Sequence, residues 1–237
     1  MSEWMRPAGR PNQALRPLSI ELNPQKHTAG SVIIRWGDTH VLCSASVEAR
    51  TPHHVTEGGW LTAEYALLPG STHTRARRER KSTSGRTAEI QRLIGRSLRG
   101  VIDLSKLEGH SLTIDCDVLQ ADGGTRCAAI TGGYIAAAIA CTRHFDYTPP
   151  PVAAVSFGLL EGHLLTDLNY DEDSTVDVDF NIVLCEEGLV EVQGAAERGV
   201  YSPTQLTQMV QGAVEVSAQL FALQRDALGR ALDELQN

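Results

Sequence analysis

Apolar side chains recur at every second position in three segments of the first half of the chain. The segments cover residues 41–47, 61–67 and 112–118, with polar or small residues at the positions between. A period of two is typical of β-strands that bury one face. Half-buried strands occur mainly in antiparallel sheets, so the pattern predicts a sheet that is mostly antiparallel.

Two other segments have the period of a helix. Residues 87–102 place their apolar side chains along one arc, and three arginines fall on the opposite side, Arg92, Arg96 and Arg99. Residues 125 to about 141 predict a second helix, whose many alanines and glycines suit close packing against the sheet. The first half is therefore expected to contain strands and two helices.

Three consecutive prolines, Pro149 to Pro151, mark a joint in the chain, because proline lacks a backbone donor and cannot continue a helix. We place the boundary between two subdomains there, giving residues 1–148 and 149–237. The second subdomain is predicted to contain strands at residues 152–159, 164–168, 176–184 and 189–193. A final helix is predicted to begin at Ser202-Pro203, with Ser202 as its cap.

The composition is that of an ordinary globular protein. The 237 residues include no apolar run of about 18 residues and no signal-type stretch at the start, so a cytoplasmic protein is expected. The five cysteines are scattered singly, which favours buried thiols over a zinc site or a disulfide frame.

The charged residues are segregated along the chain. A net charge of −8 opposes non-specific binding of nucleic acid. However, basic residues gather between Arg75 and Arg99, while acids gather between Asp167 and Glu191. This segregation allows a local anion-binding surface on an acidic protein.

The first candidate for chemistry is the run Asp122-Gly123-Gly124-Thr125-Arg126, which leads from a predicted strand into a predicted helix. Free N–H groups at a helix start favour an anion, and glycine lets the backbone approach it closely. The Thr hydroxyl and the Arg guanidinium add further donors. The run is therefore a candidate cradle for inorganic phosphate. The alternative is a simple turn in which Thr125 caps the helix.

The second candidate is Arg86, which lies in Ser84-Gly85-Arg86-Thr87 at the start of the first predicted helix. A cation is unfavourable near a helix N-terminus unless it faces an anion, so this position suggests a ligand. The alternatives are an ordinary exposed arginine at position 86 and a solvated helix face for the three arginines that follow.

The third candidate is the acidic run from Asp171 to Asn181. In a strand, Asp177, Asp179 and Asn181 share one face, where neighbouring carboxylates repel each other unless water, arginine or a cation compensates. A Mg²⁺ site of oxygen ligands would explain them, and an exposed acidic edge strand is the alternative. Together, a phosphate cradle, paired acids and an arginine-rich segment are what phosphoryl transfer on a polyanion requires.

These motifs resemble the ribonuclease PH family, and the resemblance covers roughly residues 5–225. The run from Asp115 to Arg126 is far more specific than a lone glycine motif. Further matching segments lie at residues 5–17, 30–31, 37–39, 68–75, 85–96 and 191–194.

The resemblance implies an α+β fold like that of ribosomal protein S5 domain 2, in two subdomains of β-sheet and helix. It also implies a homohexamer built as a trimer of dimers. The implied activity is phosphorolysis, in which inorganic phosphate trims the 3′ ends of tRNA precursors and releases nucleoside diphosphates. The reverse reaction would add nucleotides to RNA 3′ ends, and ribosomal RNA is a further expected substrate. No role on DNA or at a membrane is implied.

The resemblance also assigns roles to residues of this sequence. Phosphate binding falls on Arg86, Gly124, Thr125 and Arg126. RNA contacts fall on Arg75, Arg77, Arg78 and Arg80 in the loop and on Arg92, Arg96 and Arg99 in the helix. The related polynucleotide phosphorylases and archaeal exosome subunits carry an acidic pair, spaced as Asp173 and Asp179 are, that binds a divalent metal or acts as general acid. We therefore expect these two acids to be catalytic and to bind Mg²⁺.

Two positions depart from the family pattern. Asn169 stands where many relatives have an acid, and Asn181 stands where polynucleotide phosphorylase has a lysine. Three other functions compete with phosphorolysis: an inert ring subunit that only binds RNA or partners, a hydrolytic nuclease, and a housekeeping domain with solvated charges. An inert subunit would lack the phosphate arginines or the acid pair, and both are present.

Overall fold

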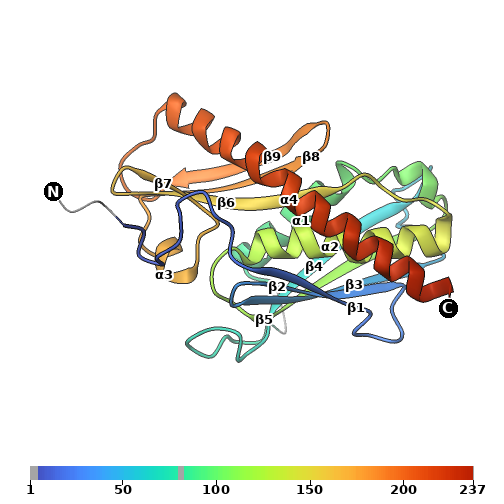
Figure 1. Cartoon of the computed structure of the whole chain (residues 1–237). Coiled ribbons are helices and arrows are strands. Elements are labelled where there is room, and N and C mark those ends of the chain that lie inside the picture. Colours follow the sequence, from blue (N-terminus) through green and yellow to red (C-terminus); the bar gives the residue numbers. More distant parts are fainter. Residues whose placement is uncertain (1–4, 80–82, 237) are drawn as a thin grey trace.

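The computed structural model describes residues 5–79 and 83–236, and Figure 1 shows two sheets with helices packed against them. The first sheet has the strand order β1-β2-β3-β5-β4, and the second has the order β7-β6-β8-β9. The predicted α+β fold is therefore confirmed.

The first sheet contains the three segments with a period of two. Its strands are β1 (Leu18–Leu22), β2 (Gly30–Trp36), β3 (Thr39–Glu48), β4 (Trp60–Leu67) and β5 (Ser111–Gln120). The alternating apolar side chains of β3, β4 and β5 are mostly buried. All neighbouring strands pair antiparallel except β4 and β5, which are parallel. The prediction of a mostly antiparallel sheet is thus confirmed with one parallel pair.

Two helices follow β4 and β5. Helix α1 (Gly85–Arg99) begins two residues before its predicted start and ends three residues before its predicted end. Its start is fixed by Ser84, whose Oγ accepts a hydrogen bond of 3.2 Å from the Thr87 backbone N–H. A short 3₁₀ turn, η1 (Leu104–Leu107), lies between α1 and β5. Helix α2 (Thr125–Phe145) begins at the predicted residue and runs four residues longer than expected.

Helix α2 lies between the two sheets. All of its residues from Cys127 to Cys141 are buried, because it packs on β2 and β3 on one side and on β6 on the other. Small residues make this approach possible: a Cβ atom at Gly30 would lie only 2.4 Å from the Ala136 carbonyl oxygen. One hydrophobic core therefore continues from the first sheet through α2 to the second sheet.

The second sheet is wholly antiparallel. Its strands are β6 (Val152–Leu160), β7 (His163–Thr166), β8 (Val178–Cys185) and β9 (Gly188–Ala196). Strand β8 pairs with β6 on one side and β9 on the other, so the alternative of an exposed acidic edge strand is wrong. A four-residue helix that the sequence did not predict, α3 (Tyr170–Asp173), lies between β7 and β8.

The C-terminal helix α4 (Pro203–Gln236) begins where predicted and crosses the molecule diagonally (Figure 1). Ser202 and Gln205 bond reciprocally at its start, at 3.2 Å and 2.8 Å. All five cysteines are free thiols; four of them are buried as expected, and Cys185 is only partly buried. Within the described ranges, no helix combines the length and the apolar character needed to cross a bilayer. The first sheet precedes the three prolines and the second follows them; the subdomain boundary itself stays a prediction.

Candidate active site

A cavity of about 1200 Å³ lies between the two sheets, at the N-terminal end of α2. Both sheets contribute to its lining, as do the starts of α1 and α2 and the end of α3. The cavity collects all six residues predicted to bind phosphate or to be catalytic: Arg86, Gly124, Thr125, Arg126, Asp173 and Asp179. The three sequence candidates therefore form one site.

The glycine turn at the start of α2 presents free backbone donors to this cavity. Gly123 and Gly124 both have left-handed conformations, with φ of 71° and 63°. Within the described residues, no side chain caps α2. Thr125 is not the cap, since Gly124 holds that position and the Thr125 hydroxyl accepts a 2.9 Å hydrogen bond from the Tyr65 hydroxyl. The simple capped turn is thus excluded, and the uncapped N–H groups are available to an anion.

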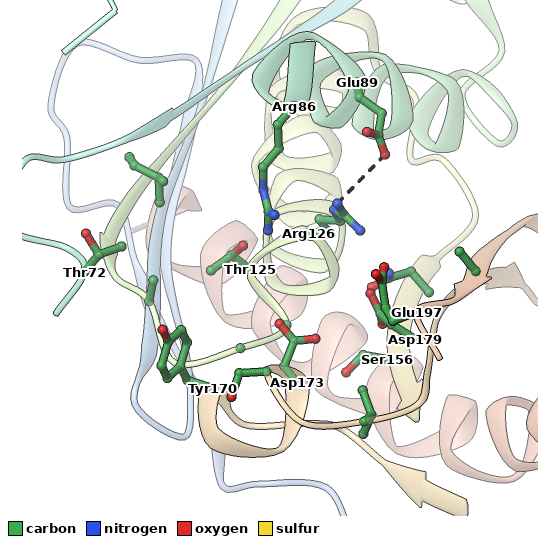
Figure 2. Close-up of a pocket in the computed structure, with 18 of the residues that line it drawn as sticks. Thr72, Arg86, Glu89, Thr125, Arg126, Ser156, Tyr170, Asp173, Asp179 and Glu197 are labelled. Carbon is green, nitrogen blue, oxygen red and sulfur yellow. Dashed lines mark ion pairs between the residues drawn. The ribbon is translucent and has the colours of Figure 1, made fainter. Parts of the chain in front are cut away.

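Two arginines flank this helix start. Figure 2 shows Arg86 extending from α1 towards Thr125, with Arg126 beside it. The side chain of Arg126 is 18% exposed, and its nearest acid is Glu89, with 3.9 Å between Nη2 and Oε1. In the part of the chain that the structure describes, the buried Nε of Arg126 has no hydrogen-bond partner. At the start of α1, the Glu79 carboxylate accepts 3.0 Å hydrogen bonds from the Ser84 N–H and the Thr87 hydroxyl. Helix α2 has no acid in its first turn, so the positive potential of its start is left for a ligand.

The two predicted catalytic acids lie on the side of the cavity away from α1 (Figure 2). Burial raises the pKa of Asp173, while Arg86 and Arg126 oppose the rise. Burial, and then the negative charge of Asp173, raise the pKa of Asp179 to about 6. The two acids therefore interact electrostatically with each other and with both arginines. A cation or a proton between the acids would be stabilised.

The shared strand face is only partly as predicted. Asp179 and Asn181 both line the cavity, and Asn181 Oδ1 accepts a 3.3 Å hydrogen bond from the thiol of Cys127. Asp177 precedes β8, lies outside the cavity lining and pairs with Arg198 at 3.1 Å. It is therefore distinct from the site acids.

Asn169, which departs from the family pattern, has a structural role. It is the N-cap of α3, where its side chain accepts a 3.0 Å hydrogen bond from the Glu172 N–H. Glu172 in turn accepts a 3.2 Å bond from the Asn169 N–H, which completes a capping box. Asparagine caps a helix about as well as aspartate, so the departure does not disturb α3.

The predicted RNA-binding arginines divide into two groups. Arg75 lines the cavity, and Arg77 and Arg78 are exposed in the same loop. Arg80 lies outside the described residues. On α1, Arg92 is exposed, Arg96 pairs with Glu191, and Arg99 donates to the Leu61 carbonyl at 2.8 Å. Arg99 also lies over the Trp60 ring, with 5.5 Å to its centroid. Arg96 and Arg99 thus have partners within the chain and do not line the cavity.

Several cavity residues were missed by the sequence reasoning. Glu197 lines the cavity and helps to raise the pKa of Asp179. It follows Gln193 at a period of two, a pattern that would have found it had the strand been extended beyond residue 193. His73 and Tyr170 also line the cavity, and their rings lie 4.8 Å apart.

The donor set fits Mg²⁺ that is completed by substrate. Among the described residues, no group of three or more His, Cys, Asp or Glu side chains forms a preformed metal cage. Asp173 and Asp179 offer two carboxylates, and protein-bound Mg²⁺ commonly takes one or two carboxylates with water and substrate phosphate oxygens. These two acids are the residues that could hold the ion.

Known protein families and relatives match nearly the whole chain. Residues 14–142 match the model of the 3′ exoribonuclease family, domain 1, and residues 150–216 match domain 2 of the same family. The chain is 49% identical to a ribonuclease PH of Crocosphaera subtropica over 96% of this chain and 99% of that protein. It is 46% identical to a ribonuclease PH of Corynebacterium kroppenstedtii over 97% of this chain and 95% of that protein.

Solved structures show the same fold at low sequence identity. Rice (Oryza sativa) Rrp46 is 19% identical with a TM-score of 0.80, over 94% of this chain and 100% of that chain. A chain of the Archaeoglobus fulgidus exosome with RNA bound to the active site is 21% identical with a TM-score of 0.79, over 91% of each chain. Both domains of the family match this chain, and a ribonuclease PH is 49% identical to it over nearly the full length of both proteins. This chain therefore belongs to the ribonuclease PH family of 3′ exoribonucleases.

Proposed function

We propose that this chain, a phosphate-dependent 3′–5′ exoribonuclease by family, binds inorganic phosphate between Arg86, Arg126 and the start of α2. The observation that carries the proposal is the uncapped start of α2, with two arginines on one side of a single cavity and two carboxylates on the other. The Nε of Arg126, which has no hydrogen-bond partner among the described residues, and the backbone N–H groups after Gly124 are suitable donors to phosphate oxygens.

The bound phosphate attacks the phosphorus of the last phosphodiester of the RNA. A new P–O–P linkage forms, the bond from phosphorus to the 3′-oxygen of the preceding nucleotide breaks, and a nucleoside diphosphate leaves. The 3′-oxygen takes a proton and becomes the new RNA end. The reverse reaction adds a nucleotide from a diphosphate and releases phosphate.

The acids act on the opposite side of the reacting phosphorus. Asp173 and Asp179 would hold Mg²⁺, which neutralises charge on the phosphate oxygens when bound. A carboxylate that holds the ion is ionised and cannot donate a proton at the same time. Of the two acids, Asp179, whose pKa the surroundings raise to about 6, is the one suited to donate a proton to the leaving 3′-oxygen when Asp173 alone would hold the ion. Arg86 and Arg126 fix the attacking phosphate and offset the negative charge that it brings to the acids.

The proposed substrates are tRNA precursors and other RNA 3′ ends, including ribosomal RNA, met in the cytoplasm. The acidic chain offers one short basic loop, so a homohexamer built as a trimer of dimers would gather several loops around one RNA. This arrangement supports the binding of a long polyanion without further basic residues.

A direct assay tests the proposed reaction. A tRNA with a 3′ extension is incubated with the protein and Mg²⁺, with and without inorganic phosphate, and the released nucleotides are resolved. We expect nucleoside diphosphates, and only when phosphate is present. Monophosphates released without phosphate would identify a hydrolytic nuclease, and RNA binding without release would identify an inert subunit.

The basic loop gives a second prediction. Replacing Arg75, Arg77, Arg78 and Arg80 together by alanine is expected to weaken tRNA binding strongly and short single strands much less, because only the longer RNA extends past the cavity. Each lost phosphate contact lowers the salt dependence, so the slope of log affinity against log salt should fall by roughly three. Titrations of both RNAs at several salt concentrations measure this.

The matched control also removes four positive charges, but from surface arginines outside the loop. Arg35, Arg50, Arg225 and Arg230 are surface arginines that each pair with an acid. Their replacement by alanine should leave the salt slope for tRNA close to that of the unmodified protein. Equal losses on tRNA and on the short strand would contradict the role of the loop.

A further inference from the structure

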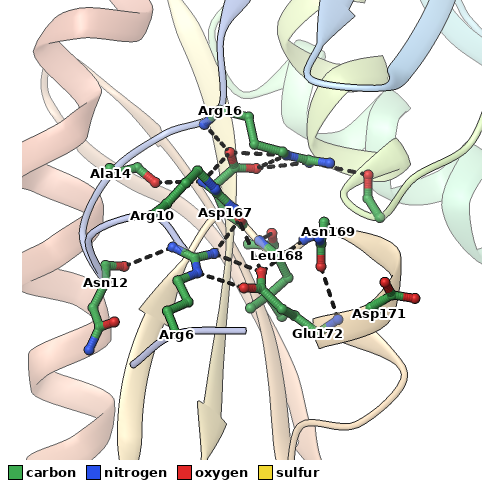
Figure 3. Close-up of polar contacts among 12 residues, drawn as sticks. Arg6, Arg10, Asn12, Ala14, Arg16, Asp167, Leu168, Asn169, Asp171 and Glu172 are labelled. Carbon is green, nitrogen blue, oxygen red and sulfur yellow. Dashed lines mark hydrogen bonds and ion pairs between the residues drawn. The ribbon is translucent and has the colours of Figure 1, made fainter. Parts of the chain in front are cut away.

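The segment before β1 brings arginines into the interior of the protein. Arg6 and Arg16 are 4% and 6% exposed, and Arg10 is partly buried. Their partners are two acids from the loop that joins β7 to β8, Asp167 at 2% exposure and Glu172 at 1%. Figure 3 shows the three guanidinium groups converging on this loop. All of these charges lie outside the cavity lining, so the proposed reaction leaves them without a role.

The first pair holds the residue next to a catalytic candidate. Arg6 donates from Nε and Nη2 to the two carboxylate oxygens of Glu172, at 2.7 Å and 2.8 Å. Arg6 Nη2 also donates to the Asp167 carbonyl at 2.9 Å. Glu172 directly precedes Asp173 in α3, and a helix of four residues has little stability of its own. The bidentate contact between Arg6 and Glu172 therefore fixes the position of the helix that carries Asp173.

The second pair joins the same loop to the phosphate cradle. Asp167 has a left-handed backbone with φ of 58°, and its carboxylate accepts bonds from the Arg16 N–H at 2.6 Å and from Trp36 Nε1 at 3.0 Å. It also accepts a 2.9 Å bond from Arg16 Nη2. The other end of the Arg16 guanidinium donates to the carbonyl of Asp122, the residue before the glycine turn. One side chain thus contacts both the acidic loop and the cradle.

The two loops also touch directly. The Tyr170 N–H donates to Asp122 Oδ1 at 3.1 Å. Gly123 leaves no space between them, because a Cβ atom there would lie 2.5 Å from the Leu168 carbonyl oxygen. The cradle and the loop that carries α3 are therefore packed against each other, and Arg16 donates hydrogen bonds both to Asp122 and to Asp167 of that loop.

A purely stabilising role does not account for so many buried charges. The desolvation of buried ion pairs often cancels their attraction, so apolar residues of the same volume usually stabilise a fold equally well. Ion pairs of this kind instead fix the orientation of the groups that they join, since each bidentate contact between arginine and carboxylate has a defined geometry. Catalytic groups need such orientation, because a displacement of about 1 Å can lower a rate by roughly a hundredfold.

We infer that the Arg6–Glu172 and Arg16–Asp167 pairs position Asp173 relative to the phosphate cradle. The four are positioning residues, which act through Asp173 and the glycine turn rather than on the substrate. This inference rests on the proposed function, in which Asp173 is one of the two acids that serve the reacting phosphodiester.

The test compares Glu172→Gln in two backgrounds. In the otherwise unmodified protein, the change should lower kcat for phosphate-dependent trimming of a 3′-extended tRNA by roughly 10- to 100-fold. The KM for phosphate should change by less than about threefold, because the Arg86 and Arg126 side is untouched. In an Asp173→Asn background, Glu172→Gln should cause little further loss, since its effect passes through Asp173.

Arg143→Lys is the matched control. Arg143 is a partly buried arginine that donates to the Ala29 carbonyl at 3.0 Å and lies outside the cavity lining. This change should lower the melting temperature and leave kcat intact. Arg6→Lys keeps the charge but loses the two-pronged contact, and it replaces Glu172→Gln if that variant does not fold.

The outcomes separate the inference from the proposed function. If Glu172→Gln lowers kcat by the same factor in both backgrounds, it acts independently of Asp173 and the inference is overturned while the proposed function stands. If Asp173→Asn alone turns over at the unmodified rate, both the role of that acid and its positioning are overturned.

Discussion

Asp179→Asn is expected to lower kcat by about 10²- to 10⁴-fold, the range typical of losing a general acid or base. The substitution removes a charge and a proton donor while keeping nearly the same volume. Asp173→Asn should lower kcat in the same range if that acid contributes to metal binding as proposed. Release of nucleoside diphosphates from a 3′-extended tRNA at saturating phosphate measures both.

Asp179→Asn should not destabilise the fold. Burial and Asp173 raise the pKa of Asp179 to about 6, so its ionisation is less favourable in the folded protein than in the unfolded chain. That cost is absent below its ordinary pKa of 3.8 and is complete above about pH 6. In a buffer with a chelator, Asp179→Asn should therefore melt at or above the temperature of the unmodified protein at pH 8, and any gain should shrink as the pH falls.

Asp177→Asn is the control for these acids. Asp177 lies two residues before Asp179 but pairs with Arg198 and does not line the cavity. Its removal is expected to leave kcat within about twofold of the unmodified value, as for a typical surface substitution. If Asp173→Asn and Asp179→Asn both turned over at the unmodified rate, the catalytic acids would have to be sought elsewhere.

Arg126→Ala is expected to raise the KM for inorganic phosphate by roughly 10- to 150-fold, the equivalent of one charge-assisted contact of about 1.5–3 kcal/mol. Arg86→Ala should act in the same direction, because its guanidinium faces the same helix start. Arg126→Lys should fall between, since lysine keeps the charge but cannot make a two-pronged contact. Initial rates at varied phosphate and fixed RNA give these values.

Binding of RNA itself should change much less in these variants. Arg35→Ala, which removes a surface arginine paired with Glu21, should leave the KM for phosphate unchanged. An unaltered phosphate requirement in both Arg86→Ala and Arg126→Ala would falsify the location of the phosphate site.

The sequence predicted those parts of the fold in which one face is buried over many residues. Strands β3, β4 and β5 show a clear period of two because only one of their faces packs on the core. Helix α3 was missed because four residues are too short for a period, although Asn169 and Glu172 have the spacing of a capping box. The parallel pairing of β4 with β5 was also missed, since alternation does not reveal which neighbour a strand takes.

In the candidate site, likewise, some residues could be predicted from local motifs and others could not. Residues in continuous motifs, such as Gly124 to Arg126, were found because glycine and arginine at a helix start have a local physical reason. The buried arginines of residues 6–16 could not be interpreted this way. Their partners lie more than 150 positions away, as for Arg6 and Glu172, and an arginine near the start of a chain is ordinarily exposed.

The burial of α2 from Cys127 to Cys141 bears on how the protein unfolds. Because both sheets pack on this one helix, removing either sheet would leave a long apolar helix face in water. A chain cut at the three prolines would therefore not yield two stable pieces. The protein should lose both sheets in a single cooperative transition, so the phosphate cradle and the acids form and disappear together.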